Sequence, residues 1–217
     1  LQKMKLEDIQ GLMKLSLSLA ELNFERYQNW ITPKEKSDLV KPAITVFTGE
    51  VYKGLDVASW KEKDFENAQE QLFILSGLYG LLRPLDLMYP YRLEMGTKMQ
   101  ISNNQKNLYQ FWGNKLADYL NSALTQKDTL VNLASTEYSK AVPFKNIKAN
   151  IITPIFKDWK GDQLKVIMMY AKHARGAMAK EIIQGNYTNL EDLKGYNVDG
   201  YMYSEAHSSG PEWVFIR

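Results

Sequence analysis

The chain has 217 residues, of which 45% are hydrophobic and 24% charged, with two histidines and no cysteine. This is the composition of a globular protein long enough to bury a core without disulfide or metal staples, and it excludes intrinsic disorder, a disulfide framework, a thiolate metal site and a cysteine nucleophile. Two histidines also exclude a three-histidine metal site, so we expect neither a metal nor a cofactor.

The charge is unevenly distributed along the chain. Residues 1–130 carry 16 basic and 16 acidic side chains, residues 131–185 carry 9 and 4, and residues 186–217 carry 2 and 5. The corresponding net charges are zero, +5 and −3. Because no linker-like, low-complexity or repeated stretch separates these parts, we predict one domain over residues 1–217. With no apolar run of membrane-spanning length and no signal peptide, the expected location is cytoplasmic.

In the first half, helices and strands are predicted to alternate. Apolar residues three or four apart predict a long amphipathic helix over residues 5–29. A β-branched run predicts a buried strand over residues 43–47. A helix capped by Ser59, with Glu62 at the capping-box position, follows and ends near Gly77. Residues 77–96 are dense in glycine, proline, arginine and tyrosine, which favours an ordered loop.

The second half continues the alternation. Apolar periodicity and turn residues predict a helix over 107–124, a strand over 129–134, a short helix over 135–141, strands over 150–156 and 164–170, a helix over 171–184, and closing strands over 200–203 and 213–216. Alternating elements of this kind predict a mixed α/β (α+β) fold, a mixed sheet flanked by helices.

The first segment that could carry chemistry is 75–86, LSGLYGLLRPLD, which joins the predicted helix to a turn. Gly77 and Gly80 permit positive φ angles and close approach of the backbone, so amides here could point at a phosphate oxygen, as in helix-hairpin-helix DNA binders. The glycines of that motif are usually two apart, whereas these are three apart. A helix C-cap followed by a tight turn explains both glycines equally well.

The second segment, residues 83–94, places four charged side chains among tyrosines and prolines: Arg83, Asp86, Arg92 and Glu94. One interpretation makes Asp86 and Glu94 a general acid and base, with the arginines steering an anion. The alternative is an ion-pair network that holds an ordered loop through arginine–carboxylate hydrogen bonds.

The third segment, YAKHARG at 170–176, lies where the predicted strand gives way to the predicted helix. The free amides and dipole of a first helical turn attract anions, and Lys172 and Arg175 share one helix face. A phosphate would fit there. The alternative is a solvated charged face.

Further basic and aromatic side chains could extend such a surface. The basic ones are Lys140, Lys145 and Lys148. Tyrosines next to the charged segments, Tyr79 among them, could stack on bases, or pack into the core with a polar tip. No phosphate-binding P-loop, dinucleotide fingerprint or nucleophile elbow occurs in the sequence.

These segments also form long, ordered words: LSGLYGLLRPLD at 75–86, PYRLEMG at 90–96, LYQFWG at 108–113, VNLAS at 131–135 followed by Glu137 and Tyr138, and YAKHARG at 170–176. In both content and order they resemble the bacterial peroxide stress protein YaaA family. The resemblance covers essentially the whole chain. The family normally begins with an N-terminal segment containing a Ser-Pro-Ala-Lys word, and this sequence lacks it.

The resemblance implies a mixed α/β fold peculiar to the family, with a basic cleft and a helix-hairpin-helix-like element that binds DNA, which here would be residues 76–83. It also implies a cytoplasmic response to hydrogen peroxide that limits damage from unincorporated iron. Lys140, Lys172 and Arg175 match basic positions in the family words and are candidates for the cleft.

We therefore expect a non-enzymatic or weakly enzymatic DNA-binding stress protein, monomeric, without a membrane partner, and binding largely independently of sequence, non-B or damaged structures included. The candidate DNA- or phosphate-binding residues are Ser76, Gly77, Tyr79, Gly80, Arg83, Arg92, Lys140, Lys172 and Arg175. The alternative is an enzyme acting on a nucleotide, nucleobase or nucleic-acid lesion, with Asp86 or Glu94 as acid or base. Without cysteine, direct tight binding of Fe(II) is not expected, so the effect on iron would be indirect.

Overall fold

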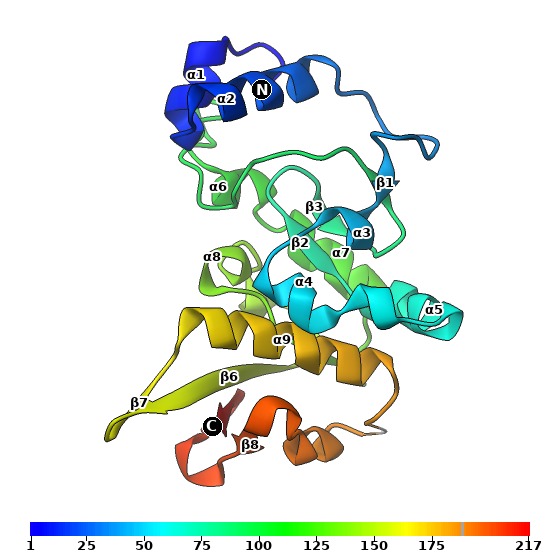
Figure 1. Cartoon of the computed structure of the whole chain (residues 1–217), viewed down its shortest axis with the longest axis vertical. Helices are drawn as coiled ribbons and strands as arrows, with labels where there is room; N and C mark the ends of the chain where they lie inside the picture. The colour runs from blue at the N-terminus through cyan, green and yellow to red at the C-terminus, as the bar shows by residue number, and fades with distance from the viewer. Residues whose placement is uncertain (188) are drawn as a thin grey trace. The chain divides into compact units, whose positions relative to one another are not determined.

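A computed structural model describes residues 1–187 and 189–217 and shows two compact units (Figure 1). Unit 1 comprises Leu1–Val46, Phe73–Leu116 and Thr136–Pro143. Unit 2 comprises Phe47–Leu72, Ala117–Ser135 and Phe144–Arg217. Helices and strands of both parallel and antiparallel pairing occur, so the expected mixed α/β class is confirmed. One domain over the whole chain stays a prediction.

Unit 1 begins with two helices where the sequence predicted one. Helix α1 (Leu6–Met13) ends at Lys14, whose φ and ψ of 52° and 50° are left-handed, and α2 (Leu17–Gln28) starts after Ser16. Apolar spacing continues across the break, which is why the pattern alone predicts a single helix. The inward side chains Ile9, Ala20 and Tyr27 are buried, as expected for the apolar face.

Two antiparallel strand pairs follow in unit 1. Strand β1 (Lys41–Pro42) pairs with β4 (Leu87–Met88), and β2 (Ile74–Ser76) pairs with β3 (Gly80–Leu82). The predicted strand over residues 43–47 is wrong: Ala43–Val46 form the short helix α3, whose first two amides donate to the carbonyls of Asp86 and Pro84. The predicted loop over 77–96 therefore contains two short strands.

Glycine also divides the next predicted helix. Helix α6 (Leu108–Trp112) is capped by the Asn107 side chain and ends at Gly113, with φ of +46°. Helix α7 (Lys115–Ala123) follows and crosses from unit 1 into unit 2. Helix α8 (Thr136–Ser139) lies within the predicted short helix.

The helices of unit 2 are α4 (Glu50–Leu55), α5 (Glu62–Gln71) and α9 (Met168–Ile183), with short 3-10 turns at Val57–Ser59, Phe144–Asn146, Glu191–Gly195, Val198–Gly200 and Glu205–His207. Ser59 does not cap α5 as predicted. The cap position is Lys61, whose amide donates to the Asp64 carboxylate at 2.9 Å. Helix α5 ends at Gln71, short of Gly77, because the chain continues into β2.

The sheet of unit 2 has the order β5 (Thr129–Val131), β6 (Asn150–Lys160), β9 (Glu212–Ile216), β8 (Met202–Tyr203), and β7 (Gln163–Lys165) pairs with the end of β6. The pairs β5–β6 and β6–β9 are parallel, and β8–β9 and β6–β7 are antiparallel. The closing strands β8 and β9 lie where the sequence predicted strands, and they pair with each other antiparallel. The predicted strand over 164–170 is mostly wrong, because α9 already begins at Met168.

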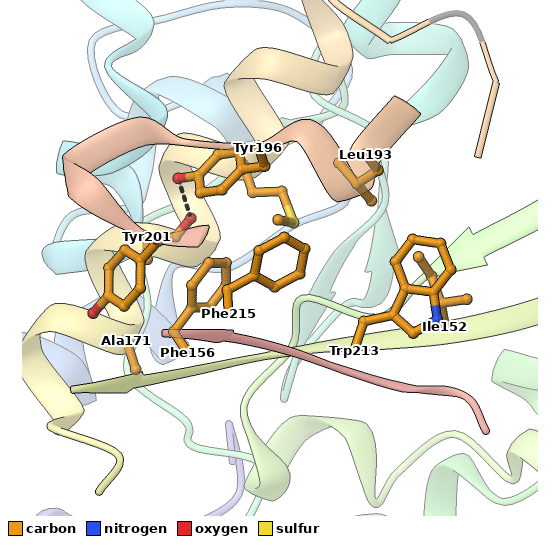
Figure 2. Packing of buried hydrophobic residues seen from close by; sticks show 10 residues of the cluster. Ile152, Phe156, Ala171, Leu193, Tyr196, Tyr201, Trp213 and Phe215 are labelled. Carbon is orange, nitrogen blue, oxygen red and sulfur yellow. Dashed lines mark hydrogen bonds between the residues drawn. The ribbon is translucent and has the colours of Figure 1, made fainter. Parts of the chain in front are cut away.

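Helix α9 packs on β6 over a core of aromatic rings (Figure 2). The Phe156 ring stacks on Phe215 at 5.5 Å and meets Tyr201 edge-on at 5.1 Å. Alternate residues of β6 point into this core, and its buried positions are 152, 154, 156 and 158. Among the residues that the structure describes, none of the helices combines the length and apolar content that crossing a bilayer requires.

Candidate nucleic-acid interface

The hairpin β2–β3 holds the residues expected to form a phosphate-binding turn. The Ser76 side chain is fully buried; its hydroxyl lies 2.5 Å from the Tyr91 hydroxyl and accepts a hydrogen bond from the Tyr79 amide at 2.9 Å. The backbone of Leu78 and of Gly77 also interacts with the Tyr91 hydroxyl. Burial raises the pKa of the Tyr91 phenol, against these hydrogen bonds, which lower it. The polar groups of this turn are therefore engaged inside unit 1.

Both glycines of this turn are required by close packing. A Cβ on Gly77 would overlap the carbonyl oxygen of Leu93, and a Cβ on Gly80 would lie 2.6 Å from the Trp112 ring. Gly80 also has a φ of +79°. The Trp112 indole donates to the Gly77 carbonyl at 3.1 Å, which closes the turn against α6. The turn is flanked by strands, so the expected junction of a helix with a turn is wrong.

Tyr79 is held by the same cluster. Its hydroxyl accepts hydrogen bonds from the Trp30 indole at 2.9 Å and the Tyr89 amide at 3.1 Å. Its ring meets that of Tyr91 edge-on at 5.5 Å. This is core packing with a polar tip, the alternative that the sequence left open for the tyrosines.

The charged segment after the hairpin serves two separate purposes. Asp86 accepts a hydrogen bond from the Arg83 amide at 2.8 Å and so closes a turn, while the Arg83 guanidinium lies 3.6 Å from the centre of the Phe73 ring. Arg92 and Glu94 form a surface pair 3.4 Å apart with half or more of each side chain exposed. Asp86 thus has a structural role, and Arg92 remains accessible at the surface.

Lys172 and Arg175 lie on α9, but not in its first turn. The helix begins at Met168, so the expected position of both side chains beside the free amides of a helix start is wrong. Lys172 is exposed. Glu50 is not available to neutralise Lys172, because the Glu50 carboxylate pairs with Lys53 at 2.6 Å. The hydrogen bond from Lys53 is the main cause of the lowered pKa of Glu50, and the charge of Lys172 lowers that pKa by a smaller amount.

Arg175 is half-buried, and burial lowers the pKa of its guanidinium. Over the part of the chain that the structure describes, no hydrogen bond, ion pair or ring contact engages this side chain. Removing a charge from water without a partner is costly, and a phosphate or carboxylate would offset that cost with two parallel hydrogen bonds.

The rotation of α9 is set by two glycines. A Cβ on Gly176 would overlap the Val51 carbonyl of α4, and a Cβ on Gly54 would overlap the His173 carbonyl. At these two glycines the backbones of α4 and α9 come close together, and α4 packs against one side of α9. The helix is thereby locked in the orientation that exposes Lys172 and leaves Arg175 half-buried.

The candidate residues are divided between the two units. Lys172 and Arg175 belong to unit 2, together with the exposed Lys145 and Lys148. Unit 1 contains the others, Ser76, Gly77, Tyr79, Gly80, Arg83, Asp86, Arg92, Glu94 and the exposed Lys140. A common basic cleft stays a prediction. No cluster of three or more histidine and carboxylate side chains suited to a metal ion occurs within residues 1–187 and 189–217.

Trp159, at the end of β6, did not emerge from the sequence as a candidate. It is 55% exposed and lies between Asp158 and Lys160. The signal was present: the strand pattern from residue 150 continues through Trp159 to a glycine–aspartate turn at 161–162, which is typical of a hairpin rather than of a strand ending at residue 156.

Known proteins match nearly the whole chain. The family model described as peroxide stress protein YaaA matches residues 1–207. A UPF0246 protein of Colwellia psychrerythraea is 52% identical over 217 residues, covering 99% of this chain and 84% of the relative. A UPF0246 protein of Saccharophagus degradans is 48% identical over 219 residues, covering 100% and 85%. On this evidence the chain belongs to the peroxide stress protein YaaA family.

Proposed function

We propose that this protein acts in the cytoplasmic response to hydrogen peroxide by binding DNA phosphates through the basic surface of unit 2, largely independently of sequence. Membership of a peroxide stress family supports the stress role. The observation that carries DNA binding is Arg175, a half-buried guanidinium without a partner among the described residues, one helical turn from the exposed Lys172.

The charge of the surrounding segment favours a polyanion over a small anion. Residues 131–185 have a net charge of +5. Their exposed lysines are spread along several elements of unit 2: Lys145, Lys148, Lys160, Lys165 and Lys172. Exposed lysines dispersed over several elements are what a protein that follows a phosphate backbone requires.

Phosphate binding also suggests an indirect route from this protein to iron. Duplex DNA is surrounded by condensed cations, and a protein that neutralises phosphates releases them. Fe(II) held at the DNA backbone would be released with the other cations. Iron would then cleave hydrogen peroxide at a greater distance from the bases. This route needs no metal ligand in the protein.

The test is fluorescence anisotropy of a labelled duplex at two salt concentrations, with a Lys172→Glu, Arg175→Glu variant. The matched control is Lys34→Glu, Lys36→Glu, which makes the same change in net charge at exposed positions of unit 1. We expect the variant at α9 to bind at least about tenfold more weakly and to reduce the slope of log affinity against log salt by about 2, because two phosphate contacts are lost.

The control should weaken binding much less, and circular dichroism should show both variants folded. Absence of binding by the unmodified protein at low salt would refute the proposal, as would equal losses in the two variants. No observation favours the enzyme alternative, because Asp86 closes a turn and Glu94 pairs with Arg92 at the surface.

A further inference from the structure

The end of β6 leaves the sheet of unit 2 as a narrow two-stranded ribbon (Figure 1). Residues 153–157 of β6 pair with β9, and residues 158–160 pair with the three residues of β7. On the β9 side, Arg217 follows the strand as far as Trp159, whose amide donates to the Arg217 carbonyl at 3.0 Å. Gly161, with φ of +61°, makes the turn between the two strands. Strand β7 pairs with β6 on one side, and β6 extends beyond Arg217 at Lys160, so a partner can approach this end of the ribbon more closely than it could the middle of a sheet.

Trp159 lies on this ribbon opposite Leu164, on the side turned away from the core. Its neighbour Asp158 points to the core side and is buried. Trp159 is 55% exposed, whereas the indoles of Trp60 and Trp213, also in unit 2, are 8% and 7% exposed. Along the described parts of the chain, no ring contact, cation–π contact or side-chain hydrogen bond engages the Trp159 indole.

The ribbon and the residue before it carry three lysines and two aspartates. Lys157 lies two residues before Trp159 on the same side of β6, whereas Lys160 and Lys165, the latter paired with Asp158, lie on the other side of the ribbon. The Asp158 carboxylate is taken up by Arg217 at 2.7 Å and by the Tyr201 hydroxyl at 2.9 Å, so it does not offset these lysines. Asp162 in the turn remains as the opposing charge. An exposed flat ring with a lysine on its own side of a narrow ribbon and two more on the other side is complementary to a base next to phosphates.

We propose that the β6–β7 ribbon binds unpaired bases of a nucleic acid, which stack on Trp159 while Lys157, on the same side of β6, contacts an adjacent phosphate and Lys160 and Lys165 add positive charge from the other side of the ribbon. This rests on the proposed DNA binding and specifies the structure that this surface selects. Bases inside a duplex are stacked on both faces and offer no free ring surface, whereas bases of a single strand or an opened duplex do. The ribbon therefore adds a preference for unpaired segments to the phosphate binding proposed for Lys172 and Arg175.

The test compares a labelled single-stranded oligothymidine with a duplex of equal length for the unmodified protein and for Trp159→Ala. Stacking on an aromatic side chain is strong enough that its loss should weaken single-strand binding roughly tenfold, with duplex binding changed less than about twofold. The matched control is Met202→Ala, which truncates a large apolar side chain that is 66% exposed on β8, outside the ribbon. Trp159→Phe should restore most of the affinity.

Tryptophan fluorescence supplies a second readout. Oligothymidine should quench the emission of the unmodified protein, and much of this quenching should be absent in Trp159→Phe. Unchanged single-strand affinity in Trp159→Ala, or an equal loss for duplex, would overturn this inference alone and leave the proposed DNA binding standing. Failure of the unmodified protein to bind either DNA at low salt would overturn both.

Discussion

Replacing Gly176 with alanine should loosen the contact of α4 with α9 that orients Lys172 and Arg175. The new Cβ would overlap the Val51 carbonyl oxygen and lie 2.7 Å from the Leu55 amide nitrogen. Both are backbone atoms, so no side-chain rotation relieves the overlap and α4 itself must move.

The expected cost follows from two opposing effects. Overpacking of this kind costs typically about 1–3 kcal/mol, and more where backbone must shift. Alanine returns roughly 1 kcal/mol through its better helix propensity. We expect a net loss of about 2 kcal/mol, which for a protein of this size corresponds to a Tm lower by about 4–8 °C. Duplex affinity should fall as well, because the two basic side chains move with the helix.

Thermal denaturation followed by circular dichroism measures the first effect, and anisotropy the second. The control is Gly11→Ala in α1, where an added Cβ meets no heavy atom within 4 Å and the change should raise stability by up to about 1 kcal/mol. A Gly176→Ala protein as stable as the unmodified one, with unchanged DNA affinity, would refute the argument that this glycine positions the site.

Three further outcomes follow from the structure. Gly80→Ala should lower the free energy of unfolding in urea by about 2 kcal/mol, since it combines strain at φ of +79° with overlap of the Trp112 ring; an unchanged urea midpoint would contradict this. Asp158→Asn should lower the free energy of unfolding by about 2 to 3 kcal/mol in the same assay, because the Arg217 guanidinium, which is 34% exposed, loses its charged partner. A loss below about 1 kcal/mol would show that water replaces the pair. The pKa of Asp128 is lowered from 3.8 by hydrogen bonds from the Thr125 amide and hydroxyl. The ionised Asp128 carboxylate therefore stabilises the fold above pH 3.8, and this stabilisation is lost as the pH falls through the lowered pKa. The stability advantage over Asp128→Asn should therefore shrink on acidification below about pH 4, and a constant difference would contradict the assignment.

Local sequence patterns located many elements but not their breaks. Strand β5, helix α8 and the closing strand β9 fall where apolar spacing and turn residues predicted them. Lys14 and Gly113 interrupt two predicted helices with positive φ angles. Apolar residues three or four apart continue across both interruptions, so periodicity could not reveal them.

The candidate site shows a similar division. The sequence identified the basic segment and the pair Lys172 and Arg175, since three-residue spacing places two side chains on one face of any helix. It could not show that α9 begins at Met168, because residues 164–170, apolar except for Lys165, suit a strand as well as a helix start.

What the sequence by itself determined is the family, the mixed α/β class, the absence of thiol chemistry and the excess of positive charge in residues 131–185, because these depend only on the order and kind of residues. Tertiary structure alone decided that the β-branched run after Pro42 becomes helix α3, since its amides bond to carbonyls some forty residues away. It likewise decided that Ser76 is buried against Tyr91 and that Trp159 is exposed. Burial and long-range hydrogen bonds depend on which distant segments meet, and no local pattern contains that information.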